Sequence, residues 1–239
     1  MTMIHLPVIG RHHSPLTQKF GIPRQPNLVN VASTIEFIAP YDTPAAFVGI
    51  EQYSHLWIVW QFHQNKSQDN FRPQVRPPRF GGNAKMGVFA TRSMYRPSAL
   101  GLSVVRLHRL EIDKQRVRLH IIGADMVDGT PIVDIKPYLP FVDSVPQAVC
   151  GTIDTPPIRT VRINQQAMLK LNELINQGNL TQTDLEIIQN LIAQDPRPAY
   201  RQGEIDTPFT LRYAKVDIDF AMLTDGAMDI VGFRLIDAR

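Results

Sequence analysis

The sequence has almost no cysteine and no long apolar run. Cys150 is the only cysteine among 239 residues, so the chain has no internal disulfide and too few thiolates for a cysteine zinc site or an iron–sulfur centre. No stretch approaches the roughly 18 apolar residues of a membrane helix, and the first residues lack the pattern of a secretory signal. These absences predict a cytoplasmic protein without a membrane partner.

The motifs of several common enzyme classes are also missing. Neither G-x-G-x-x-G nor a lysine-bearing phosphate loop occurs, which disfavours the common dinucleotide and ATP folds. Without H-E-x-x-H or a comparable ligand set, we expect no metal site. The sequence offers no recognisable nucleophile for a hydrolase, because no G-x-S-x-G string is present and Cys150 shows no local sign of activation.

What the sequence does contain predicts two modest domains. Hydrophobic residues make up 44% and charged residues 20%, which is ordinary for a globular protein. Up to about Asp143, short β-branched runs alternate with Pro and Gly, a rhythm that favours an antiparallel barrel or sandwich, and of these we expect the barrel. The predicted strands cover Val31–Ala39, His55–Phe62, Met86–Thr91, Ser103–Leu110 and Arg116–Gly123.

The pattern changes after a proline-rich stretch that we interpret as a linker. Apolar residues at helical spacing predict a helix that stops at Gly178, and a capping box of Thr181 and Asp184 opens a second helix. The predicted organisation is a mainly β N-terminal domain with a small closed β-barrel (1–145), a linker (146–160) and a smaller α+β C-terminal domain (161–239). Strands are expected over Phe209–Phe220 and Ile230–Ile236.

The positive charge is concentrated in one segment. The net charge is only +3, but from Lys66 to Arg96 Asp69 is the single acid. Prolines and glycines place this segment on an irregular loop. It is either a solvated surface loop or a groove for phosphates or a nucleotide cofactor. The basic residues are Lys66, Arg72, Arg76, Arg79, Lys85, Arg92 and Arg96.

Several ordered strings are long enough to be specific. They are Ser14-Pro15, Phe20-Gly21-Ile22-Pro23-Arg24-Gln25-Pro26, Tyr53-Ser54-His55-Leu56-Trp57, Arg76-Pro77-Pro78-Arg79, Gly87-Val88-Phe89-Ala90-Thr91-Arg92-Ser93, Arg96-Pro97, Asp125-Met126-Val127-Asp128-Gly129-Thr130-Pro131 and Asp134-Ile135-Lys136-Pro137-Tyr138. Together they closely resemble the TsaA-like family, and the whole chain looks like the TrmO-type tRNA (adenine-N6)-methyltransferases within it. Asp195-Pro196-Arg197-Pro198-Ala199-Tyr200-Arg201 matches the C-terminal domain of the bacterial members.

The resemblance implies a methyltransferase that uses S-adenosyl-L-methionine on a β-barrel. The implied substrate is tRNA with N6-threonylcarbamoyladenosine at position 37, in threonine tRNAs, and the implied assembly is a homodimer with the cofactor near its interface. Carried over position by position, the cofactor-binding residues are Pro23, Arg24, Gln25, His63, Gln64, Arg92, Leu102, Asp125, Met126, Val127 and Asp128. A carboxylate suits ribose hydroxyls, a guanidinium suits the methionine carboxylate and Leu102 suits the adenine face.

RNA contacts are predicted in both domains. Asp195–Arg201 is either a proline-terminated helix end with an exposed loop or an arginine and aromatic group that grips phosphate and stacks on a base; we favour the second. Asp128-Gly129 is likewise also a common turn dipeptide. The predicted RNA-binding residues are Arg76, Arg79, Arg96, Asp195, Arg197, Tyr200 and Arg201.

Methyl transfer from a sulfonium needs positioning and desolvation rather than a covalent nucleophile. The acceptor nitrogen is a poor nucleophile, so a proton acceptor would help. Asp128 is the first candidate, followed by Tyr95 and His63. The chain departs from relatives that read R-S-x-x-R-P-N-P-I-G, because Ser98 replaces the asparagine. The alternatives are a non-catalytic tRNA-binding module and a methyltransferase with another substrate.

Overall fold

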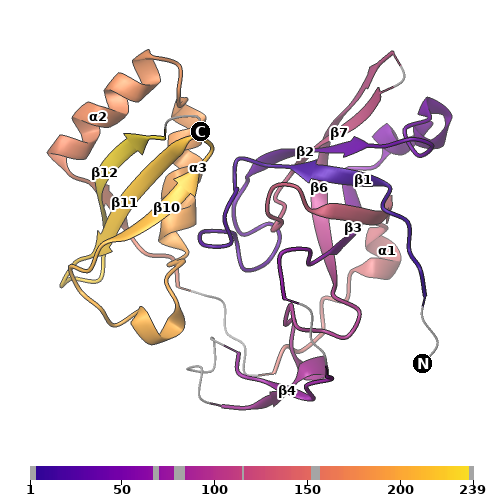
Figure 1. The fold of residues 1–239 in the computed structure, drawn as a ribbon, viewed down its shortest axis with the longest axis horizontal. Coiled ribbons are helices and arrows are strands. Elements are labelled where there is room, and N and C mark those ends of the chain that lie inside the picture. Colours follow the sequence, from indigo (N-terminus) through magenta and orange to yellow (C-terminus); the bar gives the residue numbers. More distant parts are fainter. Residues whose placement is uncertain (1–3, 67–69, 78–83, 115, 152–156, 237–239) are drawn as a thin grey trace. The chain divides into compact units, whose positions relative to one another are not determined.

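The computed structural model describes residues 4–66, 70–77, 84–114, 116–151 and 157–236 (Figure 1). The chain divides into two units that are not contiguous in sequence. The barrel unit contains the chain up to Ser14 and then Gln25–Ile153, and the C-terminal unit contains Pro15–Arg24 and Asp154–Arg239. No helix in the described ranges is long and apolar enough to span a membrane.

Six antiparallel strands close the barrel in the order β1-β2-β7-β6-β3-β8, which confirms the predicted fold class. Closure comes from β1 pairing with β8, where Gly10 lies opposite Ile132. Two barrel strands were not predicted from the sequence: β1 has only four residues, and β8 begins with a proline. The barrel strands are β1 (Gly10–His13), β2 (Ala32–Phe37), β3 (His55–Gln61), β6 (Leu100–Asp113), β7 (Arg116–Ile122) and β8 (Pro131–Pro137).

Side chains from alternate positions of the strands fill the barrel interior. Because successive side chains of a strand point to opposite faces, every second residue of β3 and β7 is buried. These residues share one core with Ile35 of β2 and Val105 of β6. Met126, beyond the end of β7, also lies in this core. The barrel is therefore packed with side chains, and a ligand must bind at its rim or outer surface.

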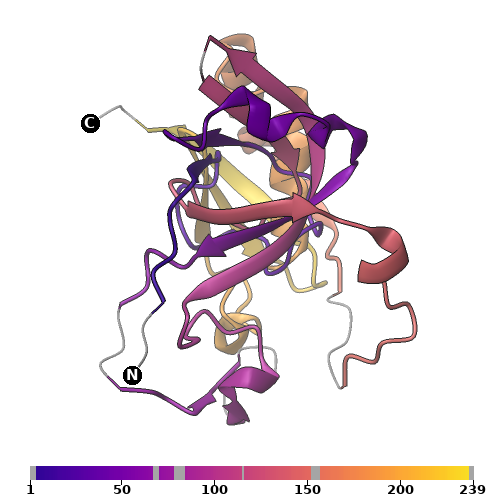
Figure 2. The same cartoon turned by 90° about the vertical axis from the view of Figure 1, so that its right-hand side faces the viewer.

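Two features extend from the barrel. The ends of β6 and β7 form a hairpin that projects beyond the other strands (Figures 1 and 2). The β4–β5 ribbon pairs β4 (Gln74–Val75) with β5 (Met86–Gly87). The predicted strand Met86–Thr91 was therefore wrong beyond Gly87, where the chain turns into a 3-10 helix, Val88–Ala90. Shorter helical segments are Pro44–Phe47, Ile50–Gln52 and α1 (Pro140–Asp143).

The C-terminal unit combines two helices with a four-stranded sheet of order β10-β11-β12-β9. The capping box of Thr181 and Asp184 is present, and Gly178 follows the first helix in a left-handed conformation, as predicted. Phe209–Phe220 is a hairpin rather than one strand, because the chain turns at Ala214. The elements of the C-terminal unit are β9 (Val161–Ile163), α2 (Gln165–Asn176), α3 (Gln182–Ala193), β10 (Phe209–Tyr213), β11 (Val216–Met222) and β12 (Met228–Leu235).

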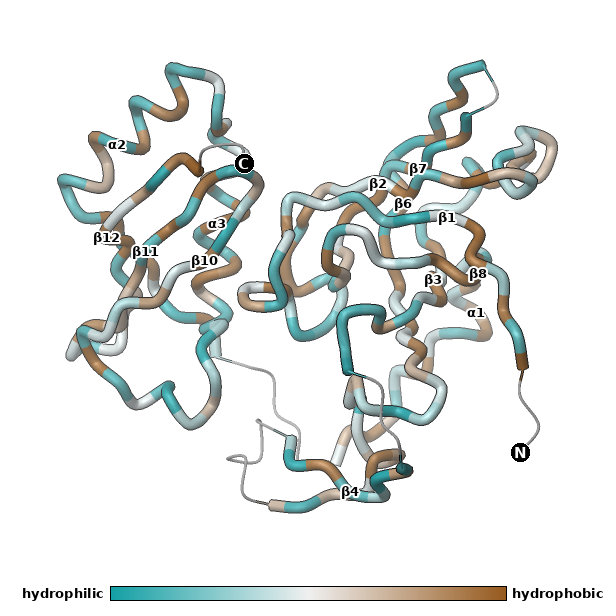
Figure 3. Tube along the Cα trace, in the orientation of Figure 1, coloured by the Kyte–Doolittle hydropathy of each residue, from teal (hydrophilic) through white to brown (hydrophobic). Residues whose placement is uncertain are grey.

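Sheet and helices of this unit have the amphipathic patterns that the sequence dictates. Along β11, apolar residues alternate with aspartates, visible as brown and teal in Figure 3. Helix α2 packs on β12. The segment Pro15–Arg24 completes this core: the ring of Phe20 stacks on Phe209 and Phe220 at centroid distances of 6.2 and 6.4 Å. The N-terminal part of the chain thus supplies part of the C-terminal unit.

Candidate functional site

A buried hydrogen-bond chain ends on Asp125, just beyond β7. Ser103 of β6 donates from Oγ to Oδ1 of Asp125 at 2.5 Å, and Trp60 of β3 donates from Nε1 to the same Oγ at 2.9 Å. Burial raises the pKa of Asp125 to about 6, while the Ser103 hydrogen bond and the charge of Arg92 act in the opposite direction. Three elements of the barrel therefore hold one carboxyl group that ionises near neutral pH.

Gln25 and Arg92 lie together at the same site. The Arg92 guanidinium donates to the side-chain oxygen of Gln25 and acts electrostatically on Asp125. Arg92 follows the 3-10 helix Val88–Ala90, and Arg96 fixes this turn by donating to the Thr91 carbonyl at 2.6 Å. The structure thus brings together a guanidinium, an amide and a carboxyl group from three of the predicted cofactor-binding positions.

In the segment Asp125–Asp128, only Asp128 has a substantially exposed side chain, at 41%. Met126 and Val127 are buried, so a bound cofactor could reach only their backbone. Asp128 accepts a hydrogen bond of 3.0 Å from the Ser14 amide and lies 3.8 Å from Nδ1 of His13. Its carboxylate is partly exposed and already tethered.

Two further predicted positions lie at the exposed end of β3. His63 and Gln64 are exposed, and a Cβ on Gly129 would lie 3.9 Å from Nε2 of His63, so His63 is near the turn that follows Asp128. Tyr95, a predicted proton acceptor, is also exposed, and its amide donates to Ser93 Oγ.

Leu102 lies on β6 beside Ser103 but on the opposite face. Its side chain is 55% exposed, whereas Ser103 is buried, because consecutive residues of a strand alternate. Leu102 therefore offers apolar surface outside the barrel and does not share the interior face that carries the Asp125 hydrogen-bond chain.

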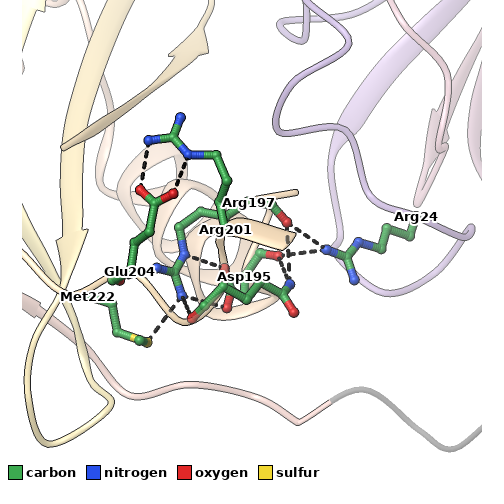
Figure 4. A network of polar contacts seen from close by, with 7 residues as sticks. Arg24, Asp195, Arg197, Arg201, Glu204 and Met222 are labelled. Carbon is green, nitrogen blue, oxygen red and sulfur yellow. Dashed lines mark hydrogen bonds and ion pairs between the residues drawn. The ribbon is translucent and has the colours of Figure 1, made fainter. Parts of the chain in front are cut away.

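Pro23 and Arg24 belong to the C-terminal unit, not to the barrel unit that carries the other predicted cofactor positions. Arg24 donates from Nη2 to the backbone carbonyls of Asp195 and Arg197 at 2.9 and 3.2 Å (Figure 4). The side chain of Gln202 donates to the same two carbonyls. The Arg24 guanidinium thus binds the loop that we expected to contact RNA.

That loop is organised around a buried ion pair. The Arg197 side chain is 0% exposed and makes two hydrogen bonds to the Asp195 carboxylate, at 2.8 and 2.9 Å (Figure 4). Its remaining donors reach the carbonyls of Glu204 and Gln202 and the sulfur of Met222. Because every guanidinium nitrogen makes a hydrogen bond within the loop, Asp195 and Arg197 hold the loop together, and their direct contact with RNA stays a prediction.

The adjacent aromatic and arginine are more accessible. Tyr200 is 83% exposed. Arg201 makes two 2.7 Å hydrogen bonds to Glu204 and its guanidinium lies 4.4 Å from the Phe209 ring centroid. The loop therefore presents an exposed tyrosine beside a braced, partly exposed arginine, which is the part of the predicted RNA contact that solvent can reach.

The basic segment has a feature that sequence reasoning missed. Arg76 is exposed, Arg96 is half-buried and Arg79 lies outside the described residues. Within this segment, Phe71 and Phe89 are both exposed and their rings stack. Single phenylalanines in a basic loop gave no pairing signal, because the β4–β5 turn that joins them was not predicted. In the described part of the chain, no cluster of His, Cys, Asp and Glu is suited to a metal ion.

The fold defines a class: a β-barrel protein with a cluster of polar side chains around Asp125 and a separate α+β unit, distinct from Rossmann-type enzymes. The family model described as "tRNA-methyltransferase O N-terminal domain" matches residues 11–144, and the model described as "TrmO C-terminal domain" matches residues 156–233. The chain belongs to the tRNA-methyltransferase O family.

Similar proteins span nearly the whole chain. The "tRNA (adenine(37)-N6)-methyltransferase" of Escherichia coli K12 is 45% identical over 205 residues, covering 85% of this chain and 86% of the relative. A crystal structure of TrmO from Pseudomonas aeruginosa has a TM-score of 0.77 at 32% identity and covers 98% of this chain and all of that one. A "Probable S-adenosyl-L-methionine-binding protein" of Pyrococcus abyssi is 35% identical and covers 56% of this chain and 68% of its own length.

Proposed function

We propose that this protein is an S-adenosylmethionine-dependent tRNA methyltransferase that methylates N6 of adenosine 37. The observation that carries the proposal is the match of both units to one enzyme family, with relatives named for this reaction. At the finer level, we propose that the substrate base is N6-threonylcarbamoyladenosine in threonine tRNAs. The family resemblance supports this substrate.

The chemistry of the barrel site fits the cofactor. S-adenosylmethionine carries a carboxylate, an ammonium group, ribose hydroxyls and an adenine ring, and when bound it supplies an electrophilic methyl group. Arg92 offers a guanidinium for the carboxylate, and Asp125 offers an acceptor for hydroxyl or ammonium groups. Leu102, on the outer face of β6, offers an exposed apolar surface, so its assignment to the adenine ring rests on the family resemblance and not on a shared face with Asp125. The Val127 carbonyl is already occupied by His12 and by the amide and hydroxyl of Thr130, so it holds the Asp125–Asp128 segment in place.

Two carboxyl groups can take up the proton that leaves N6. Asp128 is the candidate from sequence, and its carboxylate already accepts a hydrogen bond from the Ser14 amide. The raised pKa of Asp125, about 6, makes its carboxylate a better proton acceptor than an ordinary aspartate near neutral pH. We therefore add Asp125 to Asp128, Tyr95 and His63 as a candidate.

We further propose that the C-terminal domain (161–239), joined to the barrel domain (1–145) by the 146–160 linker, contacts the tRNA. Tyr200 and Arg201 are the accessible residues there, and the basic residues of the barrel unit provide phosphate contacts. As the resemblance implies, the active form would be a homodimer, and sedimentation of the purified protein tests that assembly.

One assay tests the function. Purified protein is incubated with S-adenosylmethionine and either threonylcarbamoylated or unmodified threonine tRNA, and the nucleosides are analysed by mass spectrometry. The expected result is the mass gain of one methyl group on the threonylcarbamoylated nucleoside alone. Methylation of unmodified adenosine would correct the substrate but keep the enzyme class, and no gain on either RNA would refute the reaction.

Cofactor calorimetry separates the proposal from a non-catalytic tRNA-binding module. A methyltransferase gives saturable heat with S-adenosylmethionine, and Arg92→Ala should weaken that binding because it removes the guanidinium beside Gln25 and Asp125. A tRNA-binding module would show no cofactor heat. A methyltransferase with another substrate would bind the cofactor but leave the tRNA unchanged.

A further inference from the structure

Phe71 and Phe89 form an exposed aromatic pair on the barrel unit. Their ring centroids are 6.1 Å apart, their planes differ by 25°, and the residues are 59% and 70% exposed. The other phenylalanine pair of the barrel, Phe37 with Phe47, is buried. A single exposed phenylalanine is unremarkable, but two stacked rings form a continuous apolar surface that water covers poorly.

The protein backbone fixes this pair in position. The β4–β5 ribbon joins the two segments, with Gln74 opposite Gly87. The amide of Val88 donates to the carbonyl of Pro73 at 2.9 Å, and the Val88 side chain is buried. Each phenylalanine therefore lies within two residues of a position that is hydrogen-bonded between the two segments. Because the loop is already ordered, little side-chain and loop entropy is lost when a ligand stacks on the rings.

The charge around the pair points to one kind of ligand. The sequence from Asn70 to Arg96 contains no acid. An apolar protein partner has no need of a cationic rim, whereas a single-stranded nucleic acid presents base faces and phosphates together. In the described residues, the cations of this stretch are Arg72, Arg76, Lys85, Arg92 and Arg96.

We propose that Phe71 and Phe89 form a stacking platform for an unpaired base of the tRNA anticodon loop, with the neighbouring Arg72, Arg76 and Lys85 on its phosphates. The inference rests on the proposed function, which supplies an RNA substrate modified beside the anticodon. Figure 3 shows the β4 region, where apolar brown segments alternate with hydrophilic teal ones. The platform adds base stacking to the phosphate contacts of the basic segment.

The test is the double substitution Phe71→Leu with Phe89→Leu, which keeps apolar bulk and removes both π faces. Fluorescence anisotropy with labelled threonine tRNA should show roughly 5- to 150-fold weaker binding, the range that the loss of one stacked base gives. Calorimetry should show unchanged S-adenosylmethionine binding. Phe89→Trp should retain or improve tRNA affinity, since indole stacks at least as well. Phe141→Leu, at a residue 83% exposed on α1, is the matched control and should bind tRNA like the wild type.

A second measurement does not depend on the variants folding. Ultraviolet irradiation of the wild-type protein with tRNA should cross-link bases to peptides that contain Phe71 or Phe89. Wild-type affinity in the double variant, or cross-links confined to other peptides, would overturn the platform. So would dissociation of a wild-type dimer by the double substitution, because the rings would then contact a second copy of the chain.

The platform and the proposed function fail separately. If the wild type binds tRNA through these rings but transfers no methyl group, the reaction is refuted and the platform stands. If the wild type methylates tRNA and the double variant does so with unchanged KM and affinity, the reaction stands and the platform is refuted.

Discussion

Ser103 is placed between Trp60 and Asp125, accepting a 2.9 Å hydrogen bond from the indole and donating a 2.5 Å hydrogen bond to the carboxyl group. A Cβ at Gly101 would overlap the same indole, so β6 needs glycine there for Trp60 to reach Ser103. The carboxyl group at the rim is thereby oriented from the barrel interior.

Ser103→Ala should raise the pKa of Asp125 further, because the hydroxyl that stabilises its carboxylate is lost. If Asp125 accepts the proton, the acid limb of the pH profile of kcat/KM moves to higher pH. The substitution also leaves the Trp60 indole N–H without its acceptor, which should lower the free energy of unfolding of the barrel by about 1–3 kcal/mol. Unfolding can be followed by the fluorescence of the two tryptophans, Trp57 and Trp60. Ser33→Ala is the control, because in the described chain its buried hydroxyl has no partner and its loss should be nearly neutral.

Asp125→Asn should stabilise the barrel at neutral pH. The folded-state pKa of about 6 exceeds the ordinary 3.8, so this group favours folding below pH 3.8 and loses that contribution as pH rises through 6. Asparagine still accepts from Ser103 but has no charge to bury. Urea unfolding should show a gain of about 3 kcal/mol near pH 7 and little change at pH 3.5. An equal gain at both pH values would contradict the assignment.

His12 should have the opposite effect on stability. Burial lowers its pKa from 6.5 to about 4, although its hydrogen bond to the Val127 carbonyl raises it in part. Its contribution is therefore full above pH 6.5 and is lost as pH falls through 4. In His12→Asn, the asparagine amide can occupy the Nδ1 position but does not titrate. The loss of folding free energy between neutral and acid pH should therefore be smaller than in the wild type by about 3 kcal/mol. Since the His12 and Asp125 effects oppose each other between pH 4 and 6, the wild type should depend less on pH than either variant.

Arg197→Lys should destabilise the C-terminal unit by about 3 kcal/mol, because an ammonium cannot make both bonds to Asp195 and also reach the Gln202 and Glu204 carbonyls. Hydrogen exchange in β10 and β11 would report the loss. Arg234→Lys, in an exposed pair with Asp219, should change exchange very little.

Tyr200→Ala tests the accessible part of the same loop. We expect weaker tRNA binding with unchanged hydrogen exchange, since the 83% exposed ring contributes little to packing. Unchanged affinity in this variant would remove Tyr200 from the RNA contact.

Gly21→Ala should loosen the C-terminal unit from its N-terminal segment. Gly21 has φ +93°, and a Cβ would lie 2.7 Å from Cδ1 of Leu211. We expect a loss of more than about 1 kcal/mol, seen as faster exchange in β10. Gly203→Ala, where a Cβ meets nothing within 4 Å, should leave exchange unchanged.

The sequence predicted what local patterns encode. Short apolar and β-branched runs predicted β2, β3, β6 and β7, and the capping box of Thr181 and Asp184 predicted the start of α3. Partners distant in sequence could not be predicted, because nothing near Ser103 or Phe71 specifies Asp125 or Phe89 as its neighbour. The buried state of Arg197 was missed for the same reason, since an arginine beside proline normally indicates an exposed loop.

The ring of Phe20 is synthesised early, but its stacking partners, Phe209 and Phe220, emerge near the end of translation. The C-terminal unit therefore cannot complete its core while the chain is being made, even after the barrel strands have left the ribosome. An excised fragment beginning at Asp154 would lack this ring, and a chain fused or shortened near Pro15 would damage a unit that begins more than a hundred residues later. The ten-residue segment Pro15–Arg24 thus makes the C-terminal unit depend on two distant parts of the chain.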